Sequence, residues 1–228
     1  MKSLLLCLFM FSPVVWGAER ESFDSSWKFS RFGEMPDGTT KAEPVGPAAT
    51  PAVSDFDDSQ WRTLNLPHDW GIEGPFRMDL PNRTGRLPWA GIGWYRKTLD
   101  LPVADKDKAI FLDFDGAMAQ PKVFVNGQFA GEWAYGYSSF RIDISPFVKF
   151  GAPNTIAVRL DNIADSSRWY PGGGIYRHVW LVKANPIHIA YNGVFAHSEN
   201  ITADSAEVVV TTEIQGPTEG IEIEHALL

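Results

Sequence analysis

The amino-acid sequence predicts an all-β fold, a β-sandwich, on three observations. From Phe23 onward, short runs rich in β-branched and aromatic residues are separated by Gly, Pro, Asn and Asp, which is typical of strands joined by turns. No long segment has the 3.6-residue periodicity of an amphipathic helix. Inside one run, residues 122–130, the dipeptide Asn126-Gly127 favours a type I′ turn, so two antiparallel strands are expected around it.

The other expected strands follow in chain order. They are residues 94–101, 109–114, 139–144, 155–160 and 176–182, each rich in β-branched or aromatic side chains. Before them, the proline-rich segment 36–51 has few large apolar residues. We interpret this segment as a surface insertion without regular structure, and we expect no function there.

A second domain is predicted to follow the first. Asn185-Pro186 interrupts the strand pattern, and residues 187–198 and 206–215 then resume it as two further strands. We therefore divide the chain into a sandwich domain over residues 19–186 and a second domain over 187–228. An immunoglobulin-like sandwich needs roughly 100 residues, so the second domain is expected to be incomplete.

The N-terminus has the pattern of a cleaved secretion signal. Lys2 precedes an apolar run over residues 4–15, and the small residues Gly17 and Ala18 follow. We predict a signal peptide over residues 1–18, cleavage near Gly17 or Ala18, and a secreted or periplasmic protein. The apolar run is shorter than the about 20 residues of a spanning helix, so no membrane association is expected.

Composition limits the classes of partner and cofactor. The 228 residues are 44% hydrophobic, enough for a substantial core, and the net charge of -8 argues against a nucleic-acid partner. Cys7, the only cysteine, lies in the predicted signal, so no disulfide or thiolate ligand is expected. No G-x-S-x-G, H-E-x-x-H or phosphate-loop motif occurs. We predict no metal and no cofactor.

Three stretches carry a resemblance to a known family. The first is LPHDW at 66–70 with GIGWYRK at 91–97, and the second is VFVNG at 123–127 with YGYSSFRIDI at 135–144. The third, and most specific, is DN at 161–162 with SSRWYPGGGIYR at 166–177. In this order and spacing they resemble the N-terminal domain of family 2 glycoside hydrolases, which include β-galactosidases, β-glucuronidases and β-mannosidases.

The resemblance implies a jelly-roll, galactose-binding-like sandwich followed by the first strands of an incomplete immunoglobulin-like domain. In the family, loops of the sandwich help to build the sugar site of a neighbouring (β/α)₈ barrel that holds both catalytic glutamates. Such a barrel takes about 250 residues. No catalytic residue is therefore predicted in this sequence, and the chain alone is expected to be inactive. The implied partners are a carbohydrate and the remaining domains of the same enzyme.

Sugar recognition combines aromatic faces with planar hydrogen-bonding groups. Ser167, Arg168 and Trp169 offer this mixture on one loop, just before a run of three glycines, and the resemblance brings that loop to the active site. We predict these three residues, with Asp161 and Asn162, as substrate-binding. The alternative is architectural, with Trp169 packing on the rim, Arg168 pairing with an acid, and Asp161 and Asn162 as turn formers.

Two further segments have a functional and a structural interpretation. His68 beside Asp69 suggests acid–base chemistry, but neighbours on a strand point to opposite faces, so we favour a structural role. Trp70 is then expected to fill an interdomain contact. The predicted loop 80–90, with Asn82, Arg86 and Trp89, either borders the sugar cleft or is simply exposed.

The leading hypothesis is the carbohydrate-recognition portion of a secreted family 2 glycoside hydrolase that acts on β-galactosides. The preference for galactosides rests on residues 67–70 and 168–174. One alternative is a stand-alone carbohydrate-binding module without hydrolase activity. Another is an interaction surface that donates a loop to a partner polypeptide carrying the barrel.

Overall fold

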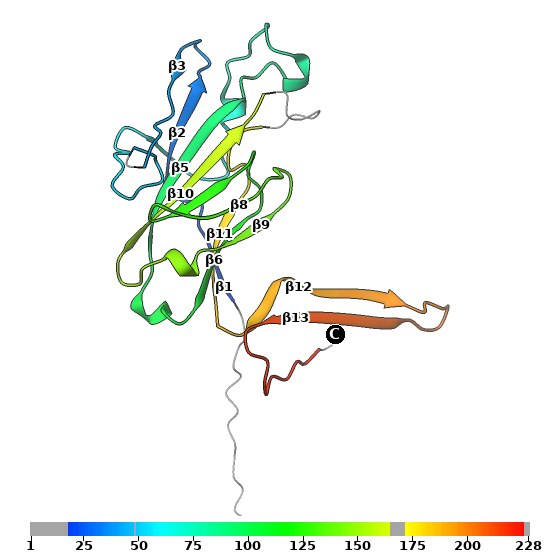
Figure 1. Cartoon of the computed structure of the whole chain (residues 1–228). Coiled ribbons are helices and arrows are strands. Elements are labelled where there is room, and N and C mark those ends of the chain that lie inside the picture. The colour runs from blue at the N-terminus through cyan, green and yellow to red at the C-terminus, as the bar shows by residue number, and fades with distance from the viewer. Residues whose placement is uncertain (1–17, 48, 165–171, 226–228) are drawn as a thin grey trace, which may run out of the picture.

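The computed structural model describes residues 18–47, 49–164 and 172–225. Two antiparallel sheets enclose a core whose side chains come from both of them (Figure 1). One sheet has the order β1-β11-β6-β9, and the other has the order β3-β2-β5-β10-β7-β8 with β4 also paired to β2. The predicted all-β sandwich is confirmed.

The thirteen strands in the described ranges are β1 (Glu19–Ser22), β2 (Trp27–Glu34), β3 (Thr40–Lys41), β4 (Arg62–Leu64), β5 (Gly91–Asp100), β6 (Ala109–Phe114), β7 (Lys122–Val125), β8 (Gln128–Glu132), β9 (Phe140–Asp143), β10 (Pro153–Asn162), β11 (Val179–Ala184), β12 (His188–Glu199) and β13 (Glu207–Gln215). Four short 3-10 turns join them: η1 (Trp70–Glu73), η2 (Asn82–Thr84), η3 (Val103–Asp105) and η4 (Ser145–Phe147). No helix in the described ranges is long and apolar enough to cross a bilayer.

The predicted hairpin is confirmed. β7 and β8 pair antiparallel, and Asn126 and Gly127 between them have φ angles of 52° and 82°. Both values lie in the left-handed region that a type I′ turn requires, which Asn and Gly adopt more readily than other residues. The Asn126 amide also donates to the Phe147 carbonyl oxygen at 2.9 Å, which ties the turn to η4.

The segment 36–51 has little regular structure, as predicted, but it is not a detached surface insertion. Glu43 accepts hydrogen bonds from Trp94 Nε1 at 2.6 Å and from Arg159 Nε at 2.7 Å. Just beyond it, Ala52 packs with Phe32, Trp94 and other residues on the outer face of the larger sheet. The segment therefore helps to cover that face. This cover explains why β2 is buried on both faces and lacks the alternating pattern of a half-exposed strand.

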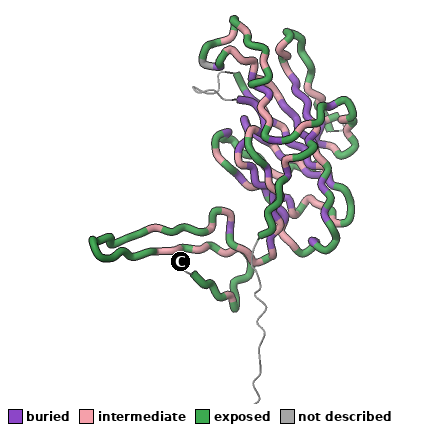
Figure 2. The backbone as a smooth tube through the Cα atoms, turned by 180° about the vertical axis from the view of Figure 1, so that it is seen from behind, coloured by how far each residue is buried: buried purple, intermediate pink, exposed green. Residues whose placement is uncertain are grey.

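β12 and β13 form a separate two-stranded ribbon after the sandwich (Figure 1). Most of their residues are exposed or half-buried, whereas buried residues follow the sandwich strands (Figure 2). Near its base, the ribbon contacts the smaller sheet through Arg141 over the Tyr191 ring at 4.6 Å. The domain boundaries at 19–186 and 187–228, and the immunoglobulin-like assignment of the second, stay predictions. The predicted signal peptide, apart from Ala18, lies outside the described residues.

The Trp70 indole lies inside the core of the sandwich, with only 2% of the residue exposed. Its ring stacks on Phe29 with centroids 5.8 Å apart, and its Nε1 donates to the Trp89 carbonyl oxygen at 2.8 Å. A Cβ atom on Gly173 would lie 2.5 Å from Trp70 Cε2, so the ring requires glycine there. The expected interdomain contact of Trp70 is wrong, because this domain's own core encloses the ring.

Replacing Trp70 with alanine is expected to lower the free energy of unfolding by about 3–5 kcal/mol, because it leaves a large cavity in the core. Urea denaturation measures this change. Trp133→Ala is the matched control, since Trp133 is 41% exposed and stacks on Phe140 at the surface, with ring centroids 5.9 Å apart. It should cost less than about 1.5 kcal/mol. Equal losses in both variants would contradict the central position of Trp70.

Candidate functional site

Two segments far apart in the sequence pair at one end of the sandwich. The His68 amide donates to the Ile175 carbonyl oxygen at 2.9 Å, and the Trp70 amide donates to the Gly173 carbonyl oxygen at 2.7 Å. Gly174 forms a second pair of backbone hydrogen bonds with Met118, both at 2.9 Å. The residues of the first and third family-like stretches therefore form one structural unit.

Asp69 holds this unit together. Its Oδ1 accepts hydrogen bonds from the Gly71 amide at 2.7 Å and from the Gly173 amide at 2.8 Å. Burial raises the pKa of Asp69, and the backbone hydrogen bonds from Gly173 and Gly71 oppose that rise. The Asp69 carboxylate therefore fixes the position of the backbone at Gly173. The contacts of Asp69 fit the structural role favoured from the sequence.

Asn162 ends β10 beside this unit and is only 1% exposed. Its amide nitrogen donates to the carbonyl oxygens of Gly172 and, at 3.4 Å, Trp89. Its Oδ1 is buried without a hydrogen-bond partner in the described part of the chain. Asn162 thus closes the base of the predicted sugar loop and leaves one unused acceptor.

Asp161 has a different environment from its neighbour. Its side chain is 33% exposed, and Oδ2 lies 3.2 Å from Arg159 Nη1. Its amide donates to the Ala119 carbonyl oxygen at 2.9 Å, so Asp161 also fixes the 115–121 segment to the end of β10. The other three predicted substrate-binding residues, Ser167, Arg168 and Trp169, lie outside the described residues.

The predicted loop 80–90 is held by its own contacts. Arg86 donates to the Leu80 carbonyl oxygen at 3.1 Å and also to that of Met78. Trp89 is 4% exposed, so its ring face is not free to stack on a sugar. Its indole Nε1 has no partner among the described residues. Trp89 therefore offers, at most, a hydrogen-bond donor.

His68 belongs to a buried polar network. Nδ1 lies 2.6 Å from the Tyr95 hydroxyl, while Nε2 lies 2.8 Å from Arg62 Nη2 and 3.0 Å from Glu73 Oε1. Burial lowers the pKa of His68, although Glu73 acts in the opposite direction. A neutral imidazole can donate from Nδ1 to Tyr95 and accept from Arg62 at Nε2, or it can accept from the Tyr95 hydroxyl at Nδ1 and donate from Nε2 to Glu73.

Burial also raises the pKa of Tyr95 well above its usual range. For Glu73, burial raises the pKa, but the hydrogen bonds from Arg62 and His68 outweigh it and leave the pKa below its ordinary value. Tyr95 is therefore a neutral phenol and Glu73 a carboxylate. The network fixes the entry into η1 and gives His68 a structural rather than a catalytic environment.

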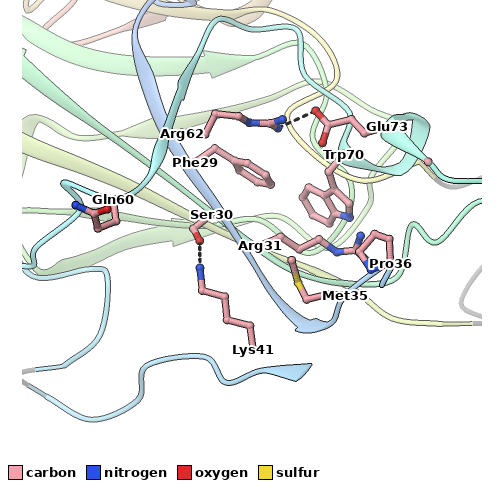
Figure 3. A pocket seen from close by; sticks show the side chains of 11 residues that line it. Phe29, Ser30, Arg31, Met35, Pro36, Lys41, Gln60, Arg62, Trp70 and Glu73 are labelled. Carbon is pink, nitrogen blue, oxygen red and sulfur yellow. Dashed lines mark hydrogen bonds and ion pairs between the residues drawn. The ribbon is translucent and has the colours of Figure 1, made fainter. Parts of the chain in front are cut away.

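A second feature, which the sequence did not predict, is a pocket of about 310 Å³ beside β2. Figure 3 shows its aromatic floor of Phe29 and Trp70 with cationic side chains around it. The lining residues are Phe29, Ser30, Arg31, Met35, Pro36, Lys41, Gln60, Arg62, Trp70, Glu73 and Gly74. They come from separate segments with no common spacing, so only the folded chain brings them together.

The described residues contain no group of three or more His, Cys, Asp or Glu side chains arranged to hold a metal ion. This end of the sandwich has two features that could contact a ligand. One is the end of β10 with Asp161 and Asn162, and the other is the pocket beside β2.

The pKa of His68 predicts how stability depends on pH. Unfolded His68 titrates at about 6.5, whereas burial keeps the folded imidazole neutral to lower pH. Between these two pKa values the unfolded chain binds more protons, so the free energy of unfolding falls as the pH falls.

We expect His68→Gln to flatten this dependence between pH 7.5 and 5.5, by at most about 1.4 kcal/mol per pH unit. Glutamine retains a donor and an acceptor for Tyr95 and Arg62. Urea denaturation at several pH values measures the slope. Identical slopes for both proteins would contradict the neutral, buried state of His68.

Comparison with known proteins places these features in a family. Residues 21–185 match the family described as "Glycosyl hydrolases family 2, sugar binding domain". The chain is 40% identical over 206 residues to the β-galactosidase BoGH2A of Bacteroides ovatus, which covers 89% of this chain and 22% of that protein. It is 41% identical over 175 residues to a putative β-glucuronidase of Formosa agariphila, covering 76% of this chain and 17% of that protein.

A solved structure shows the same fold. A β-glycosidase from Bacteroides vulgatus superposes with a TM-score of 0.74 at 37% identity, over 87% of this chain and 24% of that chain. The present chain thus spans about a sixth to a quarter of the length of these three proteins. The family model matches residues 21–185, and the relative from Bacteroides ovatus is 40% identical. The chain therefore belongs to glycoside hydrolase family 2 and contains its sugar-binding domain.

Proposed function

We propose that this chain is the carbohydrate-recognition portion of a secreted family 2 glycoside hydrolase and that it contacts β-galactosides. The observation that carries the proposal is the end of β10, where Asp161, with a side chain that is 33% exposed, offers a carboxylate beside buried Asn162 at the base of the predicted sugar loop. A partly exposed carboxylate accepts hydrogen bonds from sugar hydroxyls, and such bonds are stronger than those between neutral groups.

The choice of sugar rests on similarity. The β-galactosidase of Bacteroides ovatus aligns with 89% of the chain, and residues 67–70 and 168–174 led to the same preference. Hydrolysis with retention needs two carboxylates about 5–5.5 Å apart across the glycosidic bond. We assign neither to this chain, and propose that other domains of the same enzyme supply them. The alternative function is a stand-alone carbohydrate-binding module.

Calorimetric titration of the purified chain with galactose and lactose tests the recognition role. We expect binding at about millimolar concentration, lost in Arg168→Ala and retained in Lys106→Ala, because Lys106 is an exposed cation after η3. A chromogenic β-galactoside should not be hydrolysed. Absence of binding would contradict recognition by this chain alone, and turnover would contradict the assignment of the catalytic carboxylates to other domains.

The secretion proposal rests on Lys2, the apolar run over residues 4–15, and Gly17-Ala18. Expression of the chain in a bacterium with an export pathway should give a processed protein. Its intact mass should correspond to a start immediately after Gly17 or Ala18. A product that retains residues 1–17 would contradict the signal peptide.

A further inference from the structure

One arginine joins the segment 36–51 to the end of β10. Arg159 lies on the outer face of the larger sheet, two residues before Asp161, so both side chains are on the same side of β10. Arg159 Nε and Nη2 donate to the two carboxylate oxygens of Glu43 at 2.7 and 3.0 Å. Its Nη1 donates to Asp161 Oδ2 at 3.2 Å. The guanidinium therefore bridges two carboxylates.

Glu43 is the fixed end of this bridge. Its side chain is only 15% exposed, and its Oε1 also accepts a hydrogen bond from Trp94 Nε1 at 2.6 Å. Trp94 is 2% exposed and packs with Phe32 and Trp61. Burial raises the pKa of Glu43, but the hydrogen bonds from Arg159 and Trp94 outweigh it and leave the pKa below its ordinary value. Glu43 is thus an ionised acceptor that is anchored on a buried ring.

Asp161 is the open end of the bridge. The exposed fraction of the side chains rises from 15% at Glu43 to 20% at Arg159 and 33% at Asp161. Within the described ranges, the bond from Arg159 is the only hydrogen bond to the Asp161 carboxylate, so Oδ1 keeps its capacity to accept. Two carboxylates share one cation. The excess negative charge is therefore available at the exposed end.

The contacts of Glu43 decide how Arg159 can meet Asp161. A guanidinium pairs most strongly with a carboxylate when two of its N–H groups contact the two oxygens. Glu43 already occupies Nε and Nη2 in this way. Arg159 is therefore restricted to one contact with Asp161, and the second oxygen of Asp161 stays open to another donor. Without the Glu43 carboxylate, Arg159 can turn and engage both oxygens of Asp161.

We propose that Glu43 and Arg159 are positioning residues for the binding of a sugar hydroxyl by Asp161. Glu43 holds Arg159, and Arg159 fixes one oxygen of Asp161 while the other accepts the hydrogen bond from the ligand. This inference rests on the proposed contact of Asp161 with galactosides. It assigns a function to a residue of the segment 36–51, where the sequence predicted none.

A purely structural role for Glu43 is the alternative. In that role Glu43 only fastens the segment 36–51 to the sheet, and its replacement lowers the melting temperature without acting through Asp161. The two roles differ in how the effects of two substitutions on ligand binding combine. Residues that act through one shared contact give non-additive effects, whereas independent residues give additive ones.

A double-mutant cycle on galactose binding, measured by calorimetry, tests the proposal. We expect Glu43→Gln and Asp161→Asn each to weaken binding about tenfold, since each removes one charge-assisted hydrogen bond to the ligand. The double variant should bind no more weakly than Asp161→Asn alone. Glu21→Gln is the matched control, because it removes an exposed carboxylate paired with Lys183 on the smaller sheet, and it should leave binding unchanged. Additive losses, or full binding by Glu43→Gln when Asp161→Asn is weakened, would overturn the proposal.

Crystal structures of the wild-type chain and of Glu43→Gln give a second test that needs no ligand. We expect Arg159 in Glu43→Gln to contact both oxygens of Asp161. A guanidinium that keeps its single contact with Asp161 in this variant would overturn the positioning role, whatever the binding data show. A wild-type chain that does not bind galactose would contradict the proposed function, and the position of Arg159 in the variant would then decide the inference by itself.

Discussion

The slot that holds the Trp70 indole is the constraint on which this end of the sandwich depends. A Cβ atom on Gly93 would lie 2.8 Å from Trp70 Cη2, and one on Gly173 would lie 2.5 Å from Cε2, so glycine is required at both positions. Phe29 stacks on the same ring. The Trp70 ring therefore packs against β2, β5 and Gly173 at once. Asp69 next to it fixes Gly173 by accepting a hydrogen bond from its backbone amide.

A polar network adjoins this apolar slot and joins the core to the surface. The buried Tyr95 hydroxyl contacts His68, and His68 contacts Arg62, which pairs with Glu73. Because burial disfavours the charged form of His68, the imidazole stays neutral and can donate a hydrogen bond from only one of its two ring nitrogens. Arg62 and Glu73 then form part of the wall of the β2 pocket. The shape of that pocket is thus fixed by the core beneath it.

The sequence predicted local features well and long-range ones poorly. The Asn126-Gly127 turn was predictable because its backbone conformation depends on two adjacent residues. β2 was not, because the chain from 43 to 61 covers its outer face and removes the alternation by which a half-exposed strand is recognised. The interdomain position expected for Trp70 failed for a similar reason, since no local pattern shows that Gly93 and Gly173 lie against it. Asn162 was selected as a site residue from its motif, but its burial and its unpaired oxygen depend on the fold.

The edge of β2 shows how short neighbouring strands can leave part of a strand unpaired. β3 has only two residues and β4 only three, so together they leave part of the β2 edge uncovered. An open edge that carries lysine and arginine resists pairing with another chain, because charges must be desolvated as the strands approach. Lys41, which is exposed beside this opening, can therefore protect the uncovered part of the edge from pairing with another chain, whereas Arg31 is only 8% exposed and contributes less.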